Sequence, residues 1–160
     1  MTIAKGDKLP EATFRVMGPE GIDALTTDDV FAGKKVVLFA VPGAFTPTCS
    51  KQHLPGFVEK AGAIKAKGVD TIACVSVNDA FVMDAWGKDR SAGDAVLMLA
   101  DGNGDFSKAI GLDFDGSGIG FGVRSQRYAM VVEDGVVKSL FVEQPMKFEV
   151  SSAEAVLAAL

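Results

Sequence analysis

The segment Val41–Cys49, Val-Pro-Gly-Ala-Phe-Thr-Pro-Thr-Cys, places a cysteine where an apolar run ends and a helix is expected to begin. Thr46 suits the N-cap position and Pro47 suits the first helical position, so we expect Cys49 in the first turn. Free backbone N–H groups and the helix dipole favour an anion at that place. Because the thiolate is the nucleophilic form of cysteine, this spacing predicts chemistry at the Cys49 sulfur.

A helix terminus alone does not keep a thiol ionised at neutral pH. Lowering the pKa of an ordinary thiol from about 8.5 to about 6 requires about 3.4 kcal/mol, whereas a helix terminus supplies about 0.3–2 kcal/mol. We therefore expect a cation near the sulfur. Arg127 is the candidate, because it opens an otherwise apolar strand pattern in which an unpaired guanidinium would be costly. Its fixed fork of donors could contact both the thiolate and a substrate oxygen.

Two further residues of the same segment are candidates for the site. The Thr46 hydroxyl can accept a hydrogen bond from a substrate or donate one to it. Pro42 would shield the sulfur from water and hold the loop in shape. Plainer interpretations stay open at this point, since a cysteine in a helix is often a small buried apolar residue and an arginine often belongs to a structural salt bridge.

The elements that must position these residues follow from hydrophobic periodicity. Near-continuous apolar runs at Lys35–Val41 and Val69–Val77 predict strands that are buried on both faces, and the stretch from about Pro47 to Lys67 predicts a helix between them. Together these make a β-α-β unit with parallel strands. The further expected strands are Thr13–Met17, Ile22–Thr26, Ala95–Leu99, Arg127–Glu133 and Val136–Val142, the last two joined through Asp134-Gly135.

Shorter helical patterns complete the order of elements. One helical turn is expected at Asp28–Phe31, a helix capped by Asn78 through about Lys88, a short helix at Phe106–Ile110, and a last helix opened by Ser151 and Glu154 at capping-box spacing. This order is similar to that of a thioredoxin-like fold, an α/β architecture with a central mixed β-sheet flanked by helices, here with an N-terminal β extension. We expect a single domain over residues 1–160.

Composition excludes several classes of function. The formal net charge of -5 and the pI of about 4.8 disfavour a nucleic-acid partner. The apolar runs are too short for a membrane span, and the first residues lack the apolar core of a signal peptide, so we expect a cytoplasmic protein. Cys49 and Cys74 are the two cysteines, expected as free thiols, and with a single histidine in the chain no closed metal site is predicted.

The pattern Pro42-x-x-x-Thr46-x-x-Cys49 resembles the peroxidatic motif of the peroxiredoxins. Four longer stretches are similar to the type II (atypical, five-like) subgroup, closest to its plant-like and bacterial glutaredoxin-dependent members. They are Pro42–Phe57, Cys74–Lys88, the Leu-Ala-Asp-Gly run ending at Gly102, and Arg124–Gly135. The likeness extends over nearly the whole chain.

This resemblance implies a thiol-specific peroxidase that reduces hydrogen peroxide and alkyl hydroperoxides, in antioxidant defence and cell redox homeostasis. Cys49 would be the peroxidatic nucleophile, oxidised to a sulfenic acid, and Thr46, Arg127 and Pro42 would complete the active site. The resemblance also implies that no metal, haem or flavin is used. It implies a homodimer formed through a face near the active site, for which the candidate residues are Phe45, Phe81 and the glycine-rich loop around Phe121.

The thiol that resolves the sulfenic acid is left open. Some members of the subgroup carry a resolving cysteine before the last helix, but the segment Glu143–Ser152 contains none. Cys74 matches the second cysteine of plant-like members, to which a resolving role has been assigned, yet it lies in a pattern typical of a buried strand. The other route is an outside thiol, either glutathione with glutaredoxin, which the missing cysteine favours, or thioredoxin.

His53 follows Cys49 by four residues, so both side chains can share one helix face. It could tune the thiolate or contact a partner, or it could be a packing histidine behind the site. Two rival functions remain. One is a non-catalytic peroxide sensor or redox relay, which would also react at Cys49. The other is a holdase-like chaperone, which requires large oligomers.

Overall fold

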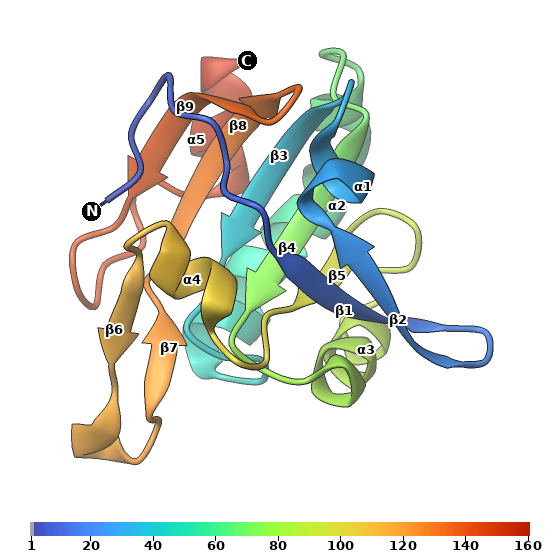
Figure 1. Ribbon diagram of the computed structural model, residues 1–160. Helices are drawn as coiled ribbons and strands as arrows, with labels where there is room; N and C mark the ends of the chain where they lie inside the picture. The colour runs from blue at the N-terminus through green and yellow to red at the C-terminus, as the bar shows by residue number, and fades with distance from the viewer. Residues whose placement is uncertain (1) are drawn as a thin grey trace.

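A seven-stranded mixed sheet forms the centre of the protein (Figure 1) in the computed structural model, which describes residues 2–160. Its strand order is β2-β1-β5-β4-β3-β8-β9. The parallel strands are β3 (Lys35–Ala40), β4 (Thr71–Ser76) and β5 (Leu97–Ala100). The antiparallel strands are β8 (Tyr128–Glu133) and β9 (Val136–Val142) on one side and β1 (Thr13–Gly18) and β2 (Gly21–Thr26) on the other.

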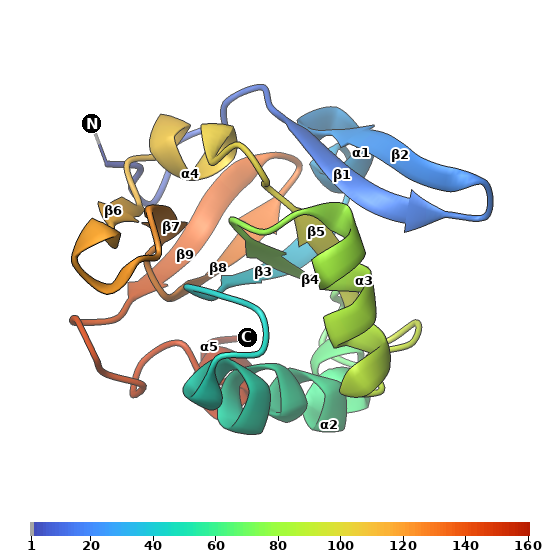
Figure 2. The same cartoon turned by 90° about the horizontal axis from the view of Figure 1, so that it is seen from below.

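Helices cover both faces of this sheet, as Figure 2 shows. One face carries α2 (Leu54–Lys65), α3 (Ala80–Asp89) and α5 (Ala153–Ala159), and the other carries α1 (Thr27–Phe31) and α4 (Asp105–Ala109). Side chains alternate between the two cores along each strand. Phe39 and its neighbour Cys74 face α2, whereas Leu38 and Ala73 face the opposite core. The predicted architecture, a mixed sheet flanked by helices with an N-terminal β extension, is confirmed.

The helix expected over Pro47–Lys67 differs from the prediction. It contains a π-helical turn at Cys49–His53, and the regular helix α2 ends at Lys65. The chain then leaves the helix through Gly68, whose φ of 90° lies in the left-handed region that glycine adopts without strain.

Two expected helix caps were one residue too early. Asp79, not Asn78, caps α3 by accepting from the backbone N–H of Val82 at 2.9 Å. Asn78 Oδ1 instead accepts from the backbone N–H of Ala44 at 3.0 Å. At α5 the cap is Ser152, because the side chain of Ser151 is hydrogen-bonded elsewhere.

A small two-stranded sheet beside the main one was not predicted. It consists of β6 (Asp113–Asp115) and β7 (Val123–Ser125), with a 3₁₀ turn at Ser117–Ile119 between them. Strands of three residues are too short to give a readable alternation.

No helix within residues 2–160 is long and apolar enough to cross a membrane.

Candidate active site

Cys49 opens a π-helical turn at the end of the sheet where β3 leads into α2. The backbone N–H of Leu54 bonds to the carbonyl of Cys49, and no side chain caps the turn. The helix begins at Pro47 as expected, with Cys49 as its third residue, and the backbone N–H of Ser50 donates to Thr46 O at 2.8 Å. The Thr46 hydroxyl differs from the expectation, because it donates to the Gly43 carbonyl at 2.7 Å instead of capping this start. π-Helical turns are rare and are frequent at functional sites.

The π-helical turn is tied to α3 from the side. The indole N–H of Trp86 donates to the Ser50 hydroxyl at 2.9 Å, and both residues are buried. Since a buried indole N–H needs a partner, this bond fixes Ser50, and with it the neighbouring Cys49, against α3. No pattern in the sequence indicated this contact.

Arg127 reaches the sulfur of Cys49 from the neighbouring strand. It directly precedes β8, whose first residue, Tyr128, pairs with Ala40 at the end of β3. The two segments therefore meet at the same edge of the sheet, and Arg127 Nη2 donates to Cys49 Sγ at 3.1 Å. The thiol side chain has no exposed surface. The cation expected beside Cys49 is present at hydrogen-bond distance.

The other side chains that contact Arg127 are aromatic. Its Nη1 lies 2.8 Å from His53 Nδ1, and its guanidinium carbon lies 5.8 Å from the centre of the Phe148 ring. In the part of the chain that the structure describes, no ion pair involves Arg127. Among these contacts, only the sulfur of Cys49 can carry the negative charge that a half-buried guanidinium requires.

The hydrogen bonds of His53 determine which ring nitrogen is protonated. Arginine can only donate, so Nδ1 accepts from Arg127, and a carbonyl can only accept, so Nε2–H donates to Ser151 O at 2.9 Å. Only the neutral imidazole satisfies both bonds. Burial, reinforced by the charge of Arg127, lowers the pKa of His53 to about 3. His53 therefore acts as an acceptor that orients Arg127, not as an acid or base near neutral pH.

The neutral state of His53 gives a prediction for stability against pH. An unfolded histidine takes up a proton near pH 6.5, but the folded one does so only near pH 3, so the unfolded state binds the extra proton in between. The contribution of His53 is complete above about pH 6.5 and is lost as the pH falls. Between pH 6 and pH 5 the free energy of unfolding should drop by about 1 kcal/mol through this residue.

Urea unfolding of the wild type and of His53→Gln at both pH values measures that drop. Glutamine also offers one acceptor and one donor but does not titrate, so the variant should lack this part of the pH dependence. Equal pH dependence in the two proteins would contradict a buried neutral His53.

Pro42 and the loop that follows it are held by a second arginine. Arg124 Nη1 donates to Pro42 O at 3.3 Å and Nε donates to Phe121 O at 3.0 Å. A Cβ at Gly43 would lie 2.9 Å from Arg124 Nη1, so a larger residue there would force the end of the Arg124 side chain to shift. Thr46, the other predicted site residue of this loop, is half-buried, and its hydroxyl bonds back to Gly43.

Cys74 lies in β4 with no exposed surface, and both cysteines are free thiols. Burial raises the pKa of the Cys74 thiol well above its usual value, and the charge of Cys49 adds to this effect. Cys74 is therefore protonated and inert in this conformation.

Residues 2–160 contain no group of three or more His, Cys, Asp or Glu side chains that could hold a metal ion.

Comparison with known proteins agrees with thiol chemistry. A family model described as Redoxin matches residues 4–157. The chain is 52% identical over 163 residues to peroxiredoxin-2E, chloroplastic, of Arabidopsis thaliana, with 99% of this chain and 70% of that protein covered.

Peroxiredoxin-2B of the same plant is 47% identical over 159 residues, with 99% and 98% covered. The crystal structure of reduced Prx3 from Vibrio vulnificus in complex with hydrogen peroxide matches with a TM-score of 0.95 and 58% identity, covering 99% of each chain. With these relatives aligned along almost its full length, the chain belongs to the redoxin family and, within it, to the type II peroxiredoxins.

Proposed function

We propose that the protein reduces hydrogen peroxide and alkyl hydroperoxides through a sulfenic acid on Cys49, with glutathione and glutaredoxin, or thioredoxin, as the reductant. Its membership of the peroxiredoxins supports thiol peroxidase activity. The observation that carries the proposal is the 3.1 Å contact from Arg127 to Cys49 Sγ, in a setting where no carboxylate of the described chain pairs with that arginine.

The proposed step is a displacement at oxygen. The Cys49 thiolate attacks the terminal peroxide oxygen, an S–O bond forms, the O–O bond breaks, and the leaving oxygen takes a proton to become water or an alcohol. Sulfur loses two electrons and becomes Cys–SOH. Arg127 has further donors for a peroxide oxygen. Because the Thr46 hydroxyl already donates to Gly43 O, its lone pairs are free to accept a hydrogen bond from the peroxide O–H.

Regeneration requires two thiol equivalents. One thiol displaces water from Cys–SOH to form a mixed disulfide, and the second releases the Cys49 thiol together with a new disulfide. Because Cys49 has no exposed surface, a bulky thiol can reach it only after the turn Cys49–His53 opens. Cys74 is the internal alternative, and it would also need this movement.

A steady-state assay tests the proposal and distinguishes the reductants. Peroxide consumption is measured with glutathione, glutaredoxin and glutathione reductase, and in parallel with thioredoxin and thioredoxin reductase, each coupled to NADPH oxidation. We expect turnover with at least one system and a higher rate with glutaredoxin. A single equivalent of peroxide consumed, with no turnover in either system, would instead identify a sensor or relay.

The same proposal includes a homodimer in the cytoplasm. Phe45 and Phe81 are exposed by 51% and 61%, and Val123 near the glycine-rich loop is also exposed. Large exposed apolar side chains favour an interaction surface. The two free thiols suit a reducing compartment, although two of the relatives carry chloroplastic names. Sedimentation at micromolar concentration distinguishes a dimer from a monomer and from the large assemblies of a holdase.

A further inference from the structure

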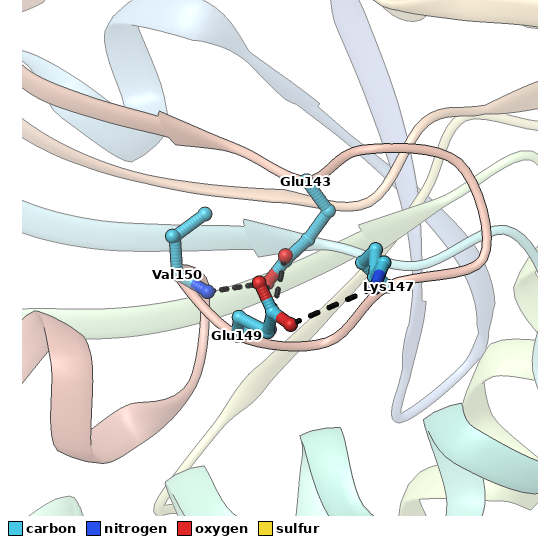
Figure 3. A network of polar contacts seen from close by, with 4 residues as sticks. All are labelled: Glu143, Lys147, Glu149 and Val150. Carbon is cyan, nitrogen blue, oxygen red and sulfur yellow. Dashed lines mark hydrogen bonds and ion pairs between the residues drawn. The ribbon is translucent and has the colours of Figure 1, made fainter.

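The loop between β9 and α5, residues 143–152, is held by one carboxylate. Glu143 Oε2 accepts from the backbone N–H groups of Glu149, Val150 and Ser151 at 2.9, 2.8 and 2.8 Å, and from the Ser151 hydroxyl at 2.7 Å. Figure 3 shows the chain curving around this carboxylate. Glu143 is only 7% exposed. Three successive amides directed at one oxygen form a concave anion site, here filled from within the chain.

The loop does not adopt this shape by backbone preference alone. Met146 has a φ of 67°, in the left-handed region that is unfavourable for a side chain other than glycine, and its side chain is fully exposed. No packing of Met146 therefore compensates for this strain. A turn bond from Lys147 N to Gln144 O at 3.0 Å encloses Met146, and the hydrogen bonds to Glu143 hold the end of the loop that follows.

The other side of the loop forms a wall of the active site. The Ser151 carbonyl accepts from His53 Nε2 at 2.9 Å, and the Phe148 ring lies 4.9 Å from the His53 ring, centre to centre. Phe148 also lies over the guanidinium of Arg127. A continuous chain of contacts therefore runs from Glu143 through Ser151, His53 and Arg127 to the sulfur of Cys49.

The charge state of Glu143 suits an acceptor of these hydrogen bonds. Burial raises its pKa, but the Ser151 hydroxyl and the backbone N–H groups of Glu149, Ser151 and Val150 oppose this effect and leave the pKa below its ordinary value. The carboxylate is thus the form present at neutral pH. By contrast, Glu149 in the same loop is exposed, and it pairs loosely with Lys147 at 3.9 Å.

We propose that Glu143 is a positioning residue for the proposed peroxidase: by holding the backbone of residues 149–151, its carboxylate sets the orientation of His53 and of the Arg127 fork at Cys49. The inference rests on the proposed function, since it concerns the reactivity of the same sulfur. Glu143 itself touches neither the sulfur nor the expected peroxide position, so its effect passes through Arg127.

Glu143→Gln tests the proposal, with Glu149→Gln as the matched control in the same loop. The Glu149 N–H also donates to Glu143 Oε1 at 3.0 Å, so a glutamine that keeps its oxygen at the Oε2 position places its amide N–H₂ against this donor. We expect about tenfold slower reaction of the variant with peroxide, measured as a second-order rate by stopped flow, because small displacements of catalytic donors have effects of this size. Glu149→Gln should react within twofold of the wild type.

A second measurement does not depend on peroxidase activity. Alkylation of Cys49 by iodoacetamide, located by peptide mass spectrometry, should be slower in Glu143→Gln, and its pH profile should move to higher pH, which a purely structural loss would not cause. Wild type that alkylates but does not turn over would disprove the proposed function alone. A folded Glu143→Gln protein with wild-type rates in both measurements would overturn the positioning role.

Should Glu143→Gln fail to fold, Ser151→Ala carries the test. It removes one hydroxyl donor to Glu143 and keeps the carbonyl that holds His53. A smaller decrease in both rates, in the same direction, is expected. Unchanged rates in Ser151→Ala would then count against the proposal.

Discussion

Replacement of Cys49 by serine is expected to reduce peroxide consumption by about 10⁴-fold or more, the scale seen when an enzyme loses its nucleophile. A serine hydroxyl stays protonated beside Arg127 and cannot form a sulfenic acid. The side chain is nearly the same size, so the fold should persist. The measurement is the rate of peroxide loss under the coupled conditions that give turnover for the wild type.

Cys74→Ser is the matched control for this loss. Both thiols are fully buried in the same core cluster, but only Cys49 contacts Arg127. Cys74→Ser should keep turnover with an outside reductant, with a loss of stability of about 1–3 kcal/mol from burying a hydroxyl. Full loss of turnover in Cys74→Ser with every reductant would assign Cys74 the resolving role. Retained activity in Cys49→Ser would end the assignment of the nucleophile.

The fold was predictable where local pattern and burial agree. The apolar runs at β3 and β4 sit in the middle of the sheet, where both faces are covered, and the Asp134-Gly135 turn joins β8 and β9 as expected. The strands β6 and β7 were missed, because three residues are too few to show an alternating pattern.

The Cys49–Arg127 contact was predictable from an energy argument. A helix terminus supplies too little stabilisation for a thiolate, and an arginine at the start of an apolar strand needs an anion. Cys49 required a cation and Arg127 required an anion, so each residue supplies the charge that the other needs. The order β4-β3-β8 in the sheet then brings them together.

The shape of the turn and its supports were not predictable. Thr46 and Pro47 mark the helix start, but no local pattern indicated the π-helical turn at Cys49–His53 or the bond from Trp86 in α3 to Ser50. Likewise, nothing in the spacing of Glu143 indicated that it holds residues 149–151. These contacts join segments that are not neighbours in the sequence, and no periodic pattern links such segments. The contacts therefore exist only in the folded chain.

Substitution of Arg127 by lysine is expected to lower kcat/KM for peroxide by about 100-fold, which corresponds to about 2.7 kcal/mol of transition-state stabilisation. Arg127 donates to His53 Nδ1 and to Cys49 Sγ at the same time, through two nitrogens of one rigid fork. A lysine ammonium keeps the charge but cannot reproduce the two directed donors together with a third toward the peroxide. The measurement is the second-order rate with hydrogen peroxide, compared with the wild type.

Arg124→Lys is the control that separates charge from geometry. Arg124 belongs to the same segment and donates to two backbone carbonyls, Phe121 O and Pro42 O. It has no contact with Cys49, so we expect a loss of less than about tenfold, by a shift of the Pro42 loop. Both substitutions conserve the charge. A much larger loss in Arg127→Lys therefore assigns the effect to the directed hydrogen bonds at the sulfur, and equal losses in the two variants would contradict that assignment.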